Sequence, residues 1–110
     1  MAWRARFDYI RAMRKDVAIA KLKEQEAAIR ALGATALYLF GSTARDEARP
    51  DSDIDVFIEY DPGSHFSLFE LAGIEVLIAE TLGVDAEVTT RNSLHPLLKK
   101  RIESSAIQVF

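Results

Sequence analysis

The chain has no cysteine among its 110 residues, and this absence excludes disulfides, thiolate zinc sites and a thiol nucleophile. Its longest apolar stretches fall far short of the roughly 20 residues that span a bilayer. Its basic N-terminus lacks the apolar segment of a secretory signal. A net charge of −3 argues against a nonspecific nucleic-acid binder. We therefore expect a cytoplasmic protein that has no membrane contact and no nucleic acid as its direct ligand.

What the chain does contain suits one small domain, because 49% of its residues are hydrophobic and 28% are charged. The charge is uneven: residues 46–61 hold seven acidic side chains and a single arginine. An acidic edge of this kind attracts divalent cations and repels a bare phosphate backbone. A nucleotide would therefore bind here as its magnesium complex.

Two apolar runs, over 36–40 and 54–60, are expected strands, and a pair of aspartates stands where the second begins. Ten residues separate Ser42 from Asp53, which is followed by Asp55. Residues two apart in a strand share a face, so both carboxylates point the same way, with Cα atoms roughly 6.6 Å apart. This spacing lets the pair bind one divalent ion, or bracket two ions about 3.5–4 Å apart.

A Gly-Ser pair follows the first expected strand, which is apolar on both faces, as a central strand is. Gly41 allows a tight turn that a ligand can approach closely, and Ser42 with the free N–H groups around it suits a triphosphate. Alone, the pair is more typical of a plain capped turn; together with the two aspartates it favours a phosphate site. Arg45, one turn further on, contacts phosphate or a partner, or else pairs with Asp46 or Glu47.

The motif Leu-Phe-Gly-Ser-Thr-Ala-Arg, followed by Arg-Pro-Asp-Ser-Asp-Ile-Asp, resembles that of the minimal nucleotidyltransferases (MNT) of the DNA polymerase β superfamily. Many of these are the antitoxin halves of HEPN–MNT toxin–antitoxin pairs. The resemblance is dense over 37–58 and departs at Asp46, where many relatives carry glycine. It implies an α/β (α+β) fold, with a small mixed β-sheet flanked by helices as the polymerase-β-like nucleotidyltransferase core. This domain would cover 13–110, after an N-terminal extension over 1–12.

A third carboxylate is expected on a strand over 84–89, where Asp85 and Glu87 alternate with apolar residues and so share a face. The superfamily usually places an aspartate on such a strand to help deprotonate the acceptor hydroxyl. Glu87 takes that position here, and Asp85 is the fallback. The resemblance also implies two Mg²⁺ ions and ATP as substrate. It assigns catalysis and metal binding to Asp53, Asp55 and Glu87, and nucleotide binding to Gly41, Ser42, Arg45 and Ser52.

Two helices are expected to flank this sheet. The first covers 16–32, is capped by Asp16 and is ended by Gly33. The second opens with a Ser-x-x-Glu capping box at Ser67 and ends at Gly83. Its expected core-facing stripe consists of Leu68, Leu71, Ala72, Glu75, Ile78, Ala79 and Leu82.

The C-terminal part predicts one more helix after residue 93, with Pro96 near its first turn, and a short strand over 106–110. The apolar residues expected to face the core are Leu94, Leu97, Leu98 and Ile102. A basic patch on this helix consists of Lys99, Lys100 and Arg101. The patch is either a solvated helix face or a contact for nucleotide phosphates or an acidic partner surface.

Three further features complete the pattern. Residues 1–12 predict a helix whose apolar side, formed by Trp3, Phe7 and Ile10, packs on its own domain, binds a partner or forms a dimer. His65 is expected to be an ordinary loop histidine. Glu59 shares a strand face with the two aspartates, where like charges repel unless a cation or water intervenes.

Little chain remains after the third expected strand, so another molecule must complete the acceptor site. The resemblance implies that this molecule is a HEPN toxin, which AMP transfer onto a tyrosine hydroxyl would neutralise. Two alternatives stay open: an MNT-like antitoxin that acts by contact alone, and a small-molecule nucleotidyltransferase that works as a dimer. The complete Gly-Ser and Asp-x-Asp set favours an enzyme, whereas a glutamate at position 87 favours the binding module.

Overall fold

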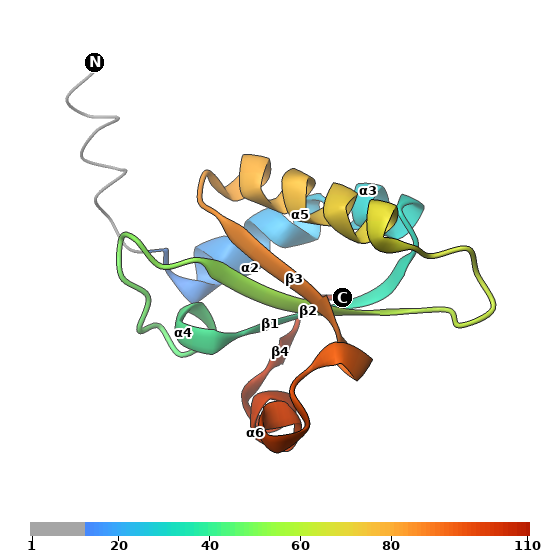
Figure 1. Ribbon diagram of the computed structural model, residues 1–110. Coiled ribbons are helices and arrows are strands. Elements are labelled where there is room, and N and C mark those ends of the chain that lie inside the picture. Colours follow the sequence, from blue (N-terminus) through green and yellow to red (C-terminus); the bar gives the residue numbers. More distant parts are fainter. Residues whose placement is uncertain (1–12) are drawn as a thin grey trace, which may run out of the picture.

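A four-stranded mixed β-sheet lies at the centre of the chain, in the strand order β3-β2-β1-β4 (Figure 1). The computed structural model describes residues 13–110. β1 (Ala34–Phe40) runs antiparallel to β2 (Ile54–Tyr60) and to β4 (Ile107–Gln108), whereas β3 (Ala86–Thr90) runs parallel to β2. A parallel pair needs a crossover connection, and α5 (Leu68–Leu82) supplies it.

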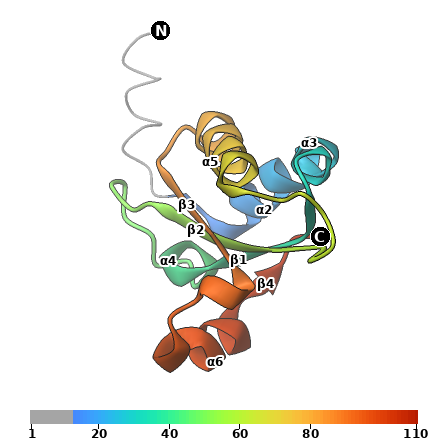
Figure 2. The same ribbon diagram turned by 45° about the vertical axis from the view of Figure 1, so that its right-hand side comes forward.

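Helices cover one face of this sheet and leave much of the other open. α2 (Lys15–Glu24), α3 (Glu26–Ala31) and α5 lie together on one side, whereas α6 (Pro96–Ser105) lies on the opposite side (Figures 1 and 2). α4 (Gly41–Ala44) continues directly from β1, and the short 3-10 helix η1 (Arg91–Ser93) follows β3. The predicted α/β fold, a small mixed sheet flanked by helices, is confirmed.

The core lies between the sheet and the helices of the covered face. Leu37 and Leu39 of β1 alternate with half-buried residues, as a strand between two different environments does. The fully buried partners of these two side chains come from β2, α2, α3 and α5, and they are Leu22, Ile29, Val56, Ile58, Ile74 and Ile78. Each buried aliphatic side chain of this kind contributes about 1.5–3 kcal/mol. This layer fixes the sheet on which the candidate site is built.

The N-terminal helix differs from the prediction in two respects. The single helix expected over 16–32 is divided at Gln25 into α2 and α3. Asp16 does not cap it, because Arg14 occupies the N-cap position and Asp16 lies in the first turn. The N–H of Lys15 instead donates to Asp46 Oδ1 at 2.8 Å. A residue distant in sequence therefore takes the role expected of a local cap.

α5 keeps its predicted ends but buries a different face. The Ser67 capping box with Glu70 is present, and Gly83 closes the helix with a left-handed φ of 72°, both as predicted. The buried residues are Ile74, Ile78 and Leu82, whereas Leu68 is 81% exposed and Glu75 is exposed. α5 is apolar around most of its circumference, so packing rather than periodicity selects the buried face.

α6 is the largest departure from the prediction, because it buries no residue. Leu94, just before it, is buried as expected, but Leu97 is 86% exposed and Leu98 is also exposed. Ile102 is half-buried. The main apolar core lies on the face of the sheet that α2, α3 and α5 cover, and α6 lies on the other face. That face carries the rings of Tyr38 and Phe57 beneath the Arg91 guanidinium, and Leu97 and Leu98 stay exposed.

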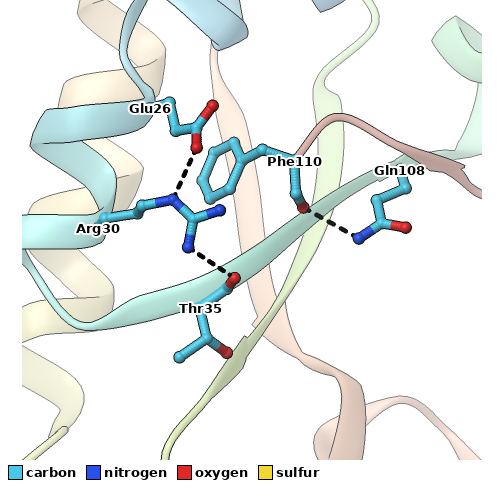
Figure 3. Close-up of polar contacts among 5 residues, drawn as sticks. All are labelled: Glu26, Arg30, Thr35, Gln108 and Phe110. Carbon is cyan, nitrogen blue, oxygen red and sulfur yellow. Dashed lines mark hydrogen bonds and ion pairs between the residues drawn. The ribbon is translucent and has the colours of Figure 1, made fainter.

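The C-terminus is fixed against α3 and β1. β4 pairs with β1 as a two-residue strand within the predicted run 106–110. Arg30 of α3 lies over the ring of Phe110, pairs with Glu26 at 2.7 Å and donates to the backbone oxygen of Thr35 at 3.0 Å (Figure 3). These contacts attach the last residue, Phe110, to α3.

Two expectations remain, one for the N-terminal extension and one for membrane spans. The extension over 1–12, its helix and its apolar side lie outside the described residues. Within 13–110, no helix has both the length and the apolar character that a membrane crossing demands.

Candidate active site

The open face of the sheet carries the candidate site at the level where three strands meet. Phe40 of β1 pairs with Asp55 of β2, and Asp55 pairs in turn with Glu87 of β3. Because β2 and β3 are parallel, residues in register point to the same face, so Asp55 and Glu87 lie side by side. Asp53 lies directly before β2, two residues ahead of Asp55. Asp53, Asp55 and Glu87 therefore lie at the same end of the paired strands β2 and β3.

Burial among neighbouring carboxylates raises the pKa of Asp55 to about 6, from an ordinary value of 3.8. Burial is the largest cause, followed by the negative charges of Glu87 and Asp53 and by a hydrogen bond between the Asp55 and Glu87 carboxyl groups. The charge of Arg45 opposes these effects. Because burial and neighbouring negative charges raise the pKa of Asp55, a cation bound beside it would stabilise its ionised carboxylate.

Glu87, rather than Asp85, is the residue in register with Asp55. Asp85 lies just before β3, where its backbone oxygen accepts from the N–H of Ile54 at 2.9 Å. Its side chain instead lines a shallow cavity of about 450 Å³ at the edge of the sheet, together with Ser52, Asp53 and the end of α5. The fallback residue Asp85 therefore lines the same cavity as Asp53 and lies one strand repeat away from Glu87 and Asp55.

Gly41 makes room for Asp55. Its φ is 76°, in the left-handed region that favours glycine, and a Cβ built at this position would collide with Oδ2 of Asp55. Any side chain at position 41 would therefore displace the carboxylate. This contact explains why a glycine follows the apolar strand at position 41.

The segment after Gly41 turns back on itself through the backbone of Ser42. The Ser42 carbonyl accepts from the N–H groups of Arg45 and Glu47 at 3.2 Å and 2.8 Å. The Arg45 guanidinium pairs with Glu47 at 3.3 Å, which is one of the alternatives that the sequence left open. Ser52 accepts from the N–H of Arg49 through its Oγ at 2.8 Å and so shapes the turn that leads into Asp53.

Thr43 lies directly after the Gly-Ser pair and has no role in the sequence-based prediction. Its side chain is 1% exposed, and its Oγ1 has no hydrogen-bond partner among the described residues. Buried hydroxyls are usually hydrogen-bonded, so this one stands out. The only sequence signal for it is its position directly after Gly41 and Ser42.

A second feature missed from the sequence is the network around Arg91. Its guanidinium lies over the rings of Tyr38 and Phe57, at 4.7 Å and 5.2 Å, and pairs with Glu59 at 2.5 Å. It also lies 3.1 Å from Glu103 of α6. The repulsion expected between Glu59 and the aspartates is thus relieved by an arginine. The same arginine connects α6 to the open face of the sheet.

The donor set of the site fits Mg²⁺, which prefers carboxylate oxygens. Asp53 and Glu87 are exposed, and Asp55 is half-buried between them. Across residues 13–110, no three His, Asp or Glu side chains converge closely enough to form a ready-made metal cluster. The Asp53 and Glu87 side chains are exposed, so each can turn toward an ion that approaches Asp55.

Comparison with known proteins agrees with this geometry. The family described as the nucleotidyltransferase domain matches residues 19–109. A protein of Methanocaldococcus jannaschii, named a "putative protein adenylyltransferase", is 44% identical over 71 residues, which are 64% of this chain and 74% of the relative. A solved "putative minimal nucleotidyltransferase" superposes with a TM-score of 0.73 at 28% identity, over 86% of this chain and 95% of the other.

Two further solved structures share the fold at lower identity. A toxin–antitoxin structure with AMP-PNP has a TM-score of 0.65 at 18% identity and covers 80% of this chain and 72% of the other. A tri-AMPylated Shewanella oneidensis HEPN toxin in complex with its MNT antitoxin gives 0.59 at 15% identity, over 87% and 71%. The matched family covers both the Gly-Ser turn and all three carboxylates. The chain therefore belongs to the nucleotidyltransferase domain family, and it is a nucleotidyltransferase.

Proposed function

We propose that this chain transfers AMP from ATP to a hydroxyl group of a protein partner in the cytoplasm, with Mg²⁺ as cofactor. The partner in this proposal is a HEPN-type toxin, which the transfer neutralises. One observation carries the proposal: Asp55 and Glu87 stand in register on paired strands, and the Asp55 carboxyl group lies directly against the Gly41 turn. A carboxylate pair next to an accessible backbone turn suits a nucleotide bound together with metal ions.

The residues divide into a nucleotide side and an acceptor side. Asp53, Asp55 and Glu87 would hold two Mg²⁺ ions, which when bound neutralise phosphate charge and lower the pKa of the attacking hydroxyl. Gly41 leaves the backbone approachable, and Ser42 would contact the β and γ phosphates. Ser52 and Arg45 would complete the nucleotide contacts, once Arg45 leaves Glu47.

Glu87 would act on the acceptor. Its carboxylate is exposed on an edge strand, where a hydroxyl of another molecule can reach it. The hydroxyl oxygen forms a bond to the α phosphorus, and the bond from that phosphorus to the bridging oxygen of the β phosphate breaks. The hydroxyl proton passes to Glu87, and pyrophosphate leaves. The acceptor carries AMP at the end of this step.

The identity of the acceptor is supported by the relatives. The Methanocaldococcus relative is named for protein adenylylation, and the Shewanella structure combines an AMPylated HEPN toxin with an MNT antitoxin. The open face of the sheet also leaves room for a large acceptor, since the described helices on the α6 side are α6 and the single turn η1, whereas α2, α3 and α5 lie on the other side. A tyrosine hydroxyl of such a partner is the group we expect to be modified.

Intact-protein mass spectrometry tests the proposal. A HEPN protein encoded beside this chain is incubated with ATP, Mg²⁺ and either the wild type or Asp53→Asn. We expect a gain of one AMP less one water, on the partner and with the wild type only. Asp61→Asn is the matched control, because Asp61 is an exposed turn residue away from the site, and this variant should transfer AMP normally.

A second candidate function is neutralisation by contact alone. It is favoured by the glutamate at position 87 and by the spacing of the carboxylates, which form no ready-made metal cluster in residues 13–110. In this case the wild type and Asp53→Asn would both neutralise the toxin fully, and neither would leave an adduct. That result would replace the transferase proposal.

A further inference from the structure

Asp46 has an unusual backbone conformation for its residue type. Its φ is 55°, and within residues 13–110 it is the sole non-glycine residue with a positive φ. Left-handed conformations strain most side chains, although aspartate and asparagine tolerate them best. Something at this position must therefore favour aspartate over the unstrained glycine.

The side chain of Asp46 supplies that advantage. Its Oδ1 accepts the N–H of Lys15, the first residue of α2, at 2.8 Å. The first N–H groups of a helix have no partner within the helix, and a negative charge is stabilising beside them. Asp46 thus caps α2 from a position 31 residues away in the chain. Glycine could adopt the same φ but could not provide the acceptor.

This hydrogen bond is the one polar link from residues 45–52 to an element outside their own neighbourhood, as far as residues 13–110 show. The other bonds of the segment are local: Arg45 and Glu47 donate to Ser42, Asp46 donates to Thr43, and Arg49 and Ser52 bond each other. The segment begins at the Gly-Ser turn and ends at Asp53. Asp46 therefore supplies the polar contact that joins this segment to α2.

We propose that Asp46 is a positioning residue, which fixes the segment 45–53 against α2 and so holds Asp53 at a set place relative to Gly41 and Ser42. The part of this inference that concerns nucleotide affinity rests on the proposed function. Without the link, the segment would move as a longer loop, and bound nucleotide would have to order it. The loss would then fall on nucleotide affinity more than on the rate of transfer.

Three variants separate the side-chain acceptor from the backbone conformation. Asp46→Asn keeps both the acceptor oxygen and tolerance of a positive φ, Asp46→Gly keeps only the φ, and Asp46→Ala keeps neither. Amide hydrogen exchange by NMR without nucleotide is the first readout. We expect exchange across 45–53 and at Lys15 to be about fivefold faster in Asp46→Gly, as the loss of one capping hydrogen bond predicts. Exchange in β1 should be unchanged, and Asp46→Asn should match the wild type.

The second readout is the dissociation constant for ATP with Mg²⁺, measured by calorimetry well below the melting temperature. We expect it to rise about fivefold in Asp46→Gly and in Asp46→Ala, with recovery in Asp46→Asn. Equal exchange and equal affinity in Asp46→Gly and the wild type would overturn the inference, as would faster exchange with unchanged affinity. If the wild type itself bound no ATP, the proposed function would fail, and the exchange rates alone would decide whether Asp46 fixes the segment.

Discussion

Gly41 and Asp55 are in direct contact, because the place where a Cβ of Gly41 would stand is taken by the Asp55 carboxyl group. The contact joins the turn after β1 to the strand that pairs with β1. It explains in steric terms why a glycine precedes the serine of the motif. It also makes position 41 sensitive to the smallest side chain.

Gly41→Ala should destabilise the protein by more than Gly83→Ala. The two glycines have nearly the same φ, 76° and 72°, so the left-handed strain of about 1–2 kcal/mol is shared. Nothing lies within 4 Å of a Cβ on Gly83, whereas at Gly41 the Asp55 carboxyl group must move. We expect about 1 kcal/mol of further loss in urea unfolding, together with loss of ATP binding. Equal losses in the two variants would show that the contact is unimportant.

Asp55→Asn should change the pH dependence of stability in a defined direction. The pKa of Asp55 is raised by folding from 3.8 to about 6, so the folded protein holds this proton more tightly than the unfolded chain. The contribution to the free energy of unfolding is fully present below pH 4 and is lost as pH rises through about 6. The full shift corresponds to about 3 kcal/mol, which water around a half-buried group reduces to about 1–2 kcal/mol.

The measurement for this prediction is urea unfolding without metal at pH 4 and pH 7.5. The asparagine variant should equal the wild type at the lower pH and exceed it by about 1–2 kcal/mol at the higher pH. The Asp61→Asn control should show no such difference, since Asp61 lies in an exposed turn. A wild type as stable as Asp55→Asn at pH 7.5 would mean that folding does not raise the pKa of Asp55.

Local signals in the sequence predicted much of this structure. The bounds of β2 agree with the prediction because aspartates precede an apolar run and Asp61-Pro62-Gly63 ends it. The capping box and closing glycine of α5 are likewise decided within a few residues. The alternation that puts Asp55 and Glu87 on exposed strand faces is also local, whereas their register with each other is seen only in the structure.

What could not be predicted depends on contacts between distant residues. The exposure of Leu97 is decided by the side of the sheet on which α6 lies, which no periodicity encodes. The bond from Lys15 to Asp46 and the pairing of Arg91 with Glu59 join parts of the chain that local patterns treat separately. Thr43 carries no signal of its own, because a buried hydroxyl without a partner is visible only in three dimensions.

Glu87→Ala should abolish AMP transfer but retain ATP binding, whereas Asp85→Ala should have a milder effect. The reason is position: Glu87 is in register with Asp55, and Asp85 lies before the strand. The readouts are adduct formation by mass spectrometry and the ATP dissociation constant. A loss of transfer in Asp85→Ala, with Glu87→Ala still active, would mean that the third carboxylate lies two residues earlier.

Thr43→Val should stabilise the protein. The Thr43 side chain is 1% exposed and its hydroxyl has no partner among the described residues, so folding removes the hydroxyl from water without compensation. Valine has nearly the same shape and no polar atom. Valine has a slightly lower helix propensity, but we still expect the free energy of unfolding in urea to rise by about 1 kcal/mol.

Thr43→Ser is the matched control, because serine keeps the hydroxyl but lacks the methyl group, and it should lose about 1 kcal/mol. The ATP affinity of Thr43→Val then shows whether the bound nucleotide uses the Thr43 hydroxyl. If Thr43→Val is more stable and binds ATP as the wild type does, the hydroxyl is a buried polar group that the nucleotide does not use. A less stable valine variant would contradict the prediction and show that the hydroxyl finds a hydrogen bond in solution, since the steric fit of the two side chains is the same.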